Sequence, residues 1–257
     1  MTSKYLVKFY FVTLLIGATI TTLISLVTEY DSVTTFLFQG EFGDFFVGLI
    51  YLIGYGLLIA TVSQVVFYIY LFINPLGLGI FRSFWPYIQI LLILYAIFDL
   101  FYLRFREVGT AHESTWSYVW IPIIIVIAAF IVAFYKNKVS ETNVFIPSLF
   151  FMIFMTSITL IPFISVEDTE WIYRSVFTVI ITNAYQLLRM PKYIEDSKQD
   201  KIRRGKTTKA DYNEQKRAEL EKEQALRQEK NKKQTKTNKK MGYKNQTRMA
   251  RKSKKDK

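Results

Sequence analysis

The sequence predicts an all-α polytopic membrane protein, with six transmembrane helices followed by a basic cytoplasmic C-terminal tail. Three observations lead to this fold class. Hydrophobic residues make up 51% of the 257 residues, and they fall in long uninterrupted blocks rather than in the spaced pattern of a soluble core. Six of these blocks are about 20 residues long, which is the length that a helix needs to cross a bilayer core of about 30 Å. Almost all charged residues lie between the blocks or at the C-terminus.

The six blocks differ in how clearly they qualify as spans. The last is the least apolar because it contains Arg174, Asn183 and Gln186. The first follows Lys4 and Lys8, but it is too long for the apolar region of a signal peptide and ends without a small-residue cleavage site, so we interpret it as a span. The predicted spans are residues 5–27, 45–73, 84–103, 117–135, 144–164 and 171–188.

The placement of Lys and Arg predicts a cell-membrane protein with both termini in the cytoplasm. With the N-terminus inside, basic residues fall on the inner side and acidic residues mostly on the outer side, with Arg104 and Arg106 as the exceptions. Residues 1–191 carry 9 Lys and Arg against 11 Asp and Glu, net −2, whereas residues 192–257 carry 24 against 10, net +14. We therefore predict a six-helix transmembrane domain over residues 1–190 and a basic, partly helical to disordered tail over residues 191–257.

Enzymatic function is not favoured by the residues present. The chain has no cysteine and a single histidine, His112, which excludes disulfides, thiolate ligands and sites made of several histidines. Motifs of metalloproteases, serine hydrolases and nucleotide-binding loops are absent from the sequence. We expect no catalytic residue, no cofactor and no metal ion.

Polar residues inside the spans are the candidates for function. Topology places four amide side chains in the cytoplasmic halves of the spans, where they are expected to form a polar pocket or switch contact, or else to hydrogen-bond between helices as packing contacts. Asp99 and Arg174 fall near the outer face, and Asp99 is expected to pair with Arg174 or Arg104, or to be functional, since ionisable groups in spans are costly. The candidate partner or polar-cluster residues are Gln64, Arg82, Gln89, Asp99, Asn183 and Gln186.

Residues 74–83 form the predicted cytoplasmic loop between the second and third spans. In one interpretation this loop contacts a partner and Arg82 supplies the docking charge. In the other, which we favour, Pro75 ends a helix, the glycines turn the chain, and Arg82 simply follows the rule that inner segments are basic.

The basic tail has three interpretations: it enforces topology, it binds anionic lipid, or it binds nucleic acid or the ribosome. Tyr212 and Tyr243 are the only aromatic residues beyond Tyr193, so base stacking has little support. We therefore rank anionic lipid first. Glu and Lys or Arg alternate over residues 209–233, which predicts a solvated helix, and residues 241–257 are expected to be disordered.

Several short motifs lie in order along the body of the chain: residues 13–18, 77–83, 98–102, 116–122, 145–147 and 183–187, with Trp85 and Gln89. Through these motifs the chain resembles the KinB-signalling pathway activation protein family (KbaA) of spore-forming Gram-positive bacteria, over about residues 1–190. The resemblance implies a protein that supports a membrane sensor histidine kinase feeding the sporulation phosphorelay, with no catalytic residues to carry over. The long basic tail departs from the family pattern.

The functional hypothesis is a non-enzymatic membrane modulator or activator of a sensor histidine kinase pathway, acting by helix association in the bilayer. One alternative is a small membrane transporter or ion pathway centred on Asp99 and the inner amides. Another is a membrane assembly factor whose basic tail binds the ribosome or lipid. Salt-sensitive sedimentation with ribosomes, lost on deleting residues 192–257, would identify the latter.

Overall fold

The computed structural model describes residues 2–28, 42–108, 116–164 and 169–205, together with short pieces between residues 213 and 224. Every element in these ranges is helical, which confirms the all-α prediction. The chain divides into two compact units, Met1–Asp196 and Ser197–Lys257. The helices are α1 (Ser3–Thr28), α3 (Phe42–Phe81), η1 (Arg82–Phe84), α4 (Trp85–Val108), α5 (Trp116–Val139), α6 (Phe145–Phe150), η2 (Phe151–Met155), α7 (Thr156–Ile164) and α8 (Thr169–Arg203).

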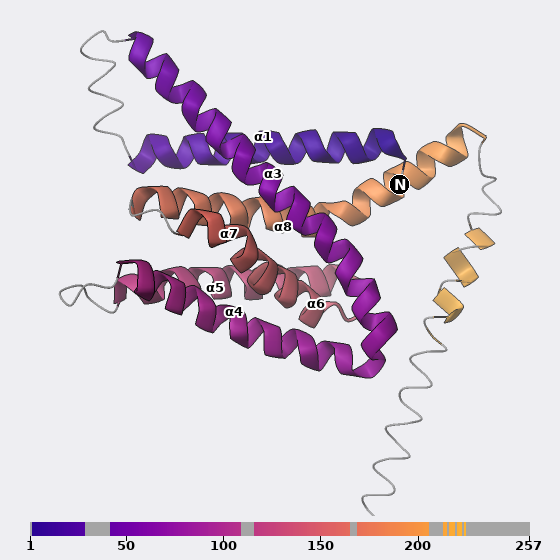
Figure 1. Ribbon diagram of the computed structural model, residues 1–257. Coiled ribbons are helices and arrows are strands. Elements are labelled where there is room, and N and C mark those ends of the chain that lie inside the picture. Colours follow the sequence, from indigo (N-terminus) through magenta and orange to yellow (C-terminus); the bar gives the residue numbers. More distant parts are fainter. Residues whose placement is uncertain are drawn as a thin grey trace, which may run out of the picture. The chain divides into compact units, whose positions relative to one another are not determined.

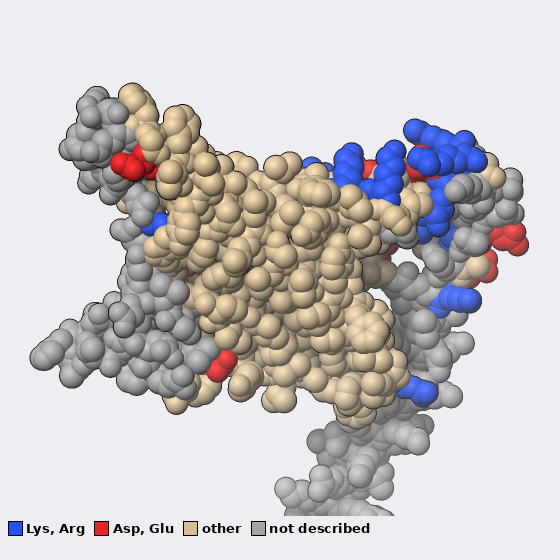
Figure 2. All heavy atoms as spheres, turned by 45° about the horizontal axis from the view of Figure 1, so that its top comes forward, with Lys and Arg blue, Asp and Glu red and all other residues tan. Residues whose placement is uncertain are grey.

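Among the described residues, four helical segments are long and apolar enough to cross a membrane, by length and composition. One of them, Phe42–Tyr102, joins α3 to α4 through the short helix η1. Figure 1 shows the chain reversing direction there, so α3 and α4 run as two separate helices. Figure 2 shows uncharged side chains covering one face of the bundle, as the segregation of charge in the sequence predicts.

The prediction of a loop over residues 74–83 is wrong, because α3 continues as a helix to Phe81. Pro75 lies inside α3 rather than at its end, which membrane helices tolerate because neighbouring groups satisfy the freed backbone. The turn occurs at Arg82, whose φ of 48° lies in the left-handed region. Gly77 permits this reversal, because an added Cβ would overlap the indole ring of Trp85.

The fifth predicted span is one helical run with an irregular centre. It comprises α6, the π-helical turn η2 and α7, over residues 145–164. Phe150, Phe151 and Met152 in this stretch are almost completely buried. A π-turn holds one residue more than an α-turn, and such turns are frequent at functional sites.

The last helix is longer than the sequence predicted. Pro191 was expected to mark the change from span to tail, but it lies inside α8, which runs on to Arg203. The expected helix over residues 209–233 falls almost wholly outside the described residues. The predicted division at residues 190 and 191 stays a prediction.

Close helix packing at small residues fixes α1 against α3. A Cβ added to Gly56 would lie 2.7 Å from the Cα of Ala18 and 2.8 Å from the carbonyl oxygen of Gly17. Membrane helices associate through such close backbone approach, because lipid tails are as apolar as leucine and no hydrophobic force drives the helices together. Ala60, one turn further along α3, is also fully buried, so the crossing consists of small residues on both helices.

Candidate functional site

The densest group of buried polar side chains lies where α3, α7 and α8 meet, and we call it the amide cluster. The Ser63 hydroxyl donates to Asn183 Oδ1 over 2.7 Å, and Asn183 Nδ2 donates to Thr156 Oγ1 over 2.8 Å. Gln186 Nε2 donates to Ser63 Oγ and to Gln64 Oε1, both over 3.2 Å. All five side chains are buried. The structure therefore brings Gln64, Asn183 and Gln186 together.

Helix geometry explains how these residues meet. Ser63 and Gln64 are consecutive on α3, and Asn183 and Gln186 are three residues apart on α8, which places the latter two on one helix face. Thr156 is the first residue after the π-turn η2. The bonds run from α8 to both other helices, so the amide cluster ties three helices together.

The chemistry of the amide cluster is hydrogen bonding alone. Its members are amides and hydroxyls, with no titratable side chain among them. Gln186 Oε1 has no hydrogen-bond partner among the described residues, and the Gln64 amide lies against the hydroxyl of Tyr68. This arrangement suits helix association or recognition of a polar group.

The polar face of α8 continues beyond the amide cluster toward its N-terminal end. The hydroxyls of Thr178 and Thr21 are 2.8 Å apart. Ser175 Oγ lies 2.7 Å from the hydroxyl of Tyr55. Each of these contacts joins α8 to α1 or α3, so polar contacts follow α8 over several turns.

Arg174 is completely buried near the start of α8. Its guanidinium carbon lies 4.7 Å from the ring centroid of Trp171, within the range of a cation–π interaction. The same Trp171 ring packs edge-on against Tyr55 at 4.6 Å. An aromatic environment of this kind stabilises a cation inside a span.

Gln89 does not join the amide cluster. Its Nε2 donates to Asn74 Oδ1 over 3.1 Å, and Trp85 Nε1 donates to the same oxygen over 3.0 Å. One acceptor on α3 therefore holds two donors on α4. These bonds brace the reversal between α3 and α4 at Arg82.

The two charged candidates differ in accessibility. Arg82 is exposed at the turn, whereas Asp99 on α4 is half-buried. The pairing of Asp99 with Arg174 stays a prediction. The side chain of Arg104, the other predicted partner, lies outside the described residues, as does His112.

Sequence reasoning missed several members of these clusters. Ser63 and Thr156 are short hydroxyl residues within apolar runs, where they usually bond to their own helix and give no periodic signal. Asn74 was assigned to a loop. Counting Ser, Thr and Asn together with Gln at interhelical positions would have found them.

Metal chemistry has no support in the described part of the chain, which holds no group of three or more His, Cys, Asp or Glu residues placed to bind an ion. The polar clusters are instead built from neutral donors and acceptors. Their arrangement fits a protein whose spans must hold defined positions.

Comparisons with known proteins agree with the resemblance seen in the sequence. A family model described as KinB-signalling pathway activation in sporulation matches residues 17–193. The KinB-signaling pathway activation protein of Bacillus subtilis (strain 168) is 34% identical over 195 residues, which cover 75% of this chain and 98% of the relative. No solved structure matches. The family is named for activating a signalling pathway and not for a reaction. The chain belongs to the KbaA family of KinB-signalling pathway activation in sporulation.

Proposed function

We propose that the protein is a six-span membrane activator of the KinB signalling pathway that associates with a sensor histidine kinase inside the bilayer. The family match over residues 17–193 carries this proposal. Association between spans acts without chemistry, since a contact that favours one kinase state shifts the kinase by its difference in affinity for the two states. The hydrogen bonds of the amide cluster, which join α3, α7 and α8, agree with such a role.

The helix lengths support six spans in this proposal. At about 1.5 Å per residue, the 40 residues of α3 measure about 60 Å and the 24 residues of α4 about 36 Å, so each exceeds a hydrocarbon core of about 30 Å. Two spans therefore fit within the single apolar segment Phe42–Tyr102. The sixth is the apolar first half of α8, whose one charge in residues 171–188, Arg174, is buried.

In this proposal, both ends of the six-span region lie on the same side of the membrane. Phe9, near the start of α1, has its ring centroid 5.2 Å from that of Tyr193, which follows the last predicted span. Phe9 also stacks on Tyr185 at 6.0 Å. An even number of spans requires this arrangement, and the basic residues place that side in the cytoplasm.

The surface that meets the kinase is proposed to lie at the turn between α3 and α4. The amide cluster and Gln89 are buried, so a partner helix cannot touch them in this conformation, and they act by fixing the positions of the spans. Arg82 is exposed beside Phe84 and Tyr87, which are 72% and 70% exposed. An exposed cation flanked by aromatic rings suits an acidic and apolar partner surface.

The basic tail is proposed to contact anionic lipid rather than the kinase. The family match ends at residue 193, so the tail lies beyond the shared region. Residues 230–257 alone carry 13 Lys and Arg against one Asp. A segment with this charge, tethered to a span, is attracted to anionic headgroups. Binding to nucleic acid or the ribosome is the competing role for the same charge.

Site-specific photocrosslinking in membranes tests the proposal. A photoreactive residue replaces Phe84 or Tyr87 at the turn, and as a matched control it replaces Phe134, which is equally exposed on α5. We expect a sensor histidine kinase to be captured from the first two positions and not from Phe134. Capture from Phe134 alone would place the contact on another face.

A shortened chain that ends at Lys192 separates the spans from the tail. Capture of the kinase by this chain is the expected result, since the family match is almost complete without the tail. Recovery of ribosomes, only with the full-length chain and lost in high salt, would instead assign the function to nucleic-acid binding by the tail.

A further inference from the structure

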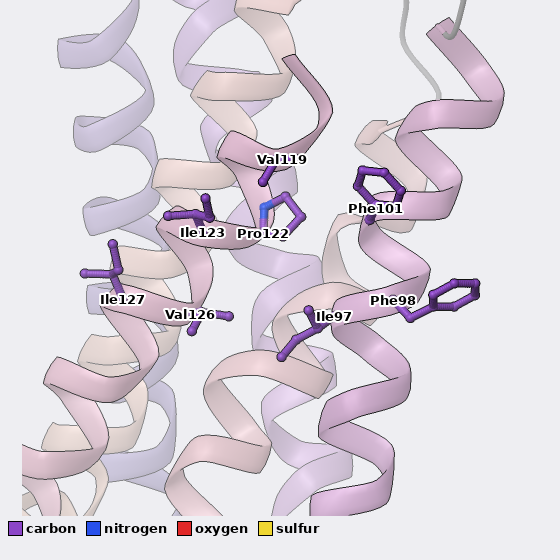
Figure 3. A pocket seen from close by; sticks show the side chains of 8 residues that line it. All are labelled: Ile97, Phe98, Phe101, Val119, Pro122, Ile123, Val126 and Ile127. Atoms are coloured by element: carbon purple, nitrogen blue, oxygen red, sulfur yellow. The ribbon is translucent and has the colours of Figure 1, made fainter. Parts of the chain in front are cut away.

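An apolar groove lies between α4 and α5, apart from every polar cluster described above. Its volume is about 400 Å³. Figure 3 shows the rings of Pro122 and Phe101 facing each other across one end, and Ile97 and Val126 directed into the gap from opposite walls. The remaining lining residues are Phe98, Val119, Ile123 and Ile127.

The groove faces away from the core of the bundle. Ile121, Ile125, Ala129 and Ala133, four residues apart on α5, form a fully buried stripe. The groove residues of α5 stand beside this stripe, and two residues on the rim, Phe98 and Ile127, are 63% and 55% exposed. The groove is therefore open at the outer surface of the bundle.

The position along the helices decides which medium meets the groove. Both walls belong to segments apolar enough to cross a membrane, Phe42–Tyr102 and Val119–Val139. All eight lining residues are apolar. At the proposed depth in the membrane, an open groove of this kind meets the hydrocarbon of the bilayer.

The dimensions favour a single chain over a helix. Val119 to Ile127 covers about 12 Å of helix axis at about 1.5 Å per residue, so a volume of about 400 Å³ gives a mean cross-section of about 33 Å². A helix about 10 Å in diameter has a cross-section of about 80 Å². A partner helix is thus too thick to enter, whereas a single acyl chain is not.

We infer that the groove between α4 and α5 binds one acyl chain of a membrane phospholipid. Val119, Pro122 and Val126 contact the chain from one side, and Ile97 and Phe101 from the other. The chain completes the packing of two helices that leave a gap between them. This inference rests on the membrane insertion in the proposed function, and it is independent of the kinase.

Photolabelling with a phospholipid that carries a diazirine on its acyl chain tests the inference. Full-length protein is reconstituted in vesicles of phosphatidylcholine and phosphatidylglycerol that contain the probe, and labelled residues are mapped by mass spectrometry. We expect labelling of groove residues several-fold above that of Ile131 and Phe134, which are exposed on α5 outside the groove. Equal labelling at both sets would show only the general lipid coat and would overturn the inference.

Filling the groove gives a second test. Val126→Phe occupies the gap from α5, and Ile97→Phe occupies it from α4, so one variant suffices if the other does not fold. We expect either to reduce groove labelling several-fold, while the matched control Ile131→Phe leaves it unchanged. The inference would be overturned if a folded variant with a filled groove were labelled as strongly as the unchanged protein. It would also be overturned if a kinase captured at Ile97 displaced the label.

Alkaline extraction of the same membranes distinguishes a failure of this inference from a failure of the proposed function. Protein released by this treatment is not inserted, which contradicts the six-span proposal itself. Protein retained without preferential groove labelling contradicts the acyl-chain site alone.

Discussion

The two sides of the helical bundle are held together by different means. On one side, α1, α3 and α8 meet through small residues and buried hydrogen bonds, with Gly56 against Ala18 and Asn183 bonded to Ser63. On the other side, α4 and α5 meet with a groove between them, lined only by apolar residues. Close packing and hydrogen bonds therefore define the first side, whereas the second side leaves a gap between two apolar helix faces.

The helix crossing on the closely packed side should be the most sensitive to added volume. We expect Gly56→Leu to cost at least about 3 kcal/mol or to prevent accumulation, because overpacking against backbone atoms cannot be relieved by side-chain motion. Thermal unfolding in detergent measures the loss. Gly54→Leu is the matched control, since a Cβ there meets nothing within 4 Å. Equal losses at both positions would mean that this crossing is not specific.

Two isoleucines on α5 allow the packed core and the open groove to be compared within one helix. Ile125 is 1% exposed and Ile127 is 55% exposed, on the rim of the groove. We expect Ile125→Ala to cost about 2–3 kcal/mol through the cavity that it leaves, and Ile127→Ala less than about 1 kcal/mol. Denaturant unfolding in detergent micelles compares the two variants. Similar costs would contradict the groove as a loosely packed surface.

The amide cluster should contribute less than either packing effect. Asn183→Ala removes bonds to Ser63 and Thr156 and leaves both hydroxyls buried, so we expect a cost of about 1–2 kcal/mol. A double-mutant cycle with Ser63→Ala should return a coupling of about 0.6 kcal/mol, as is usual between membrane helices. A coupling of zero would argue against this bond.

Substitution of Arg82 is expected to change stability least, and it separates an effect on function from an effect on stability. Its φ of 48° suits glycine, so Arg82→Gly should stabilise the fold by up to about 1 kcal/mol while removing the exposed charge. We expect pathway activation, measured with a sporulation reporter, to fall in this variant even though the protein is more stable. Arg82→Lys keeps the charge and should retain activation. Full activation with glycine would exclude Arg82 from partner binding.

Much of the fold was predictable because span length and apolar content are local properties of the sequence. The helix boundaries were less predictable. The sequence predicts a helix end at Pro75, but Pro75 lies within α3, since a proline ends a helix only when nothing else satisfies the freed carbonyl. The π-turn at residues 151–155 has no signal in hydrophobic periodicity, because the whole stretch is apolar.

The candidate residues were recognised as polar, but their grouping required the structure. Gln64, Asn183 and Gln186 meet in one cluster, while Gln89 bonds to Asn74 instead. Depth in the membrane is set by the sequence, but the direction in which a side chain faces around the bundle depends on helix rotation. Helix rotation in turn depends on close contacts such as Gly56 with Ala18.

The π-turn in the fifth helix has a consequence for how related sequences align. Because the turn Phe151–Met155 holds one residue more than regular α-helix, removal of one residue there would restore regular geometry and leave the faces of both flanking segments unchanged. Removal of a residue elsewhere in the helix would rotate everything after it by about 100°. A single-residue gap between relatives is therefore tolerated at residues 151–155, with Thr156 kept opposite Asn183.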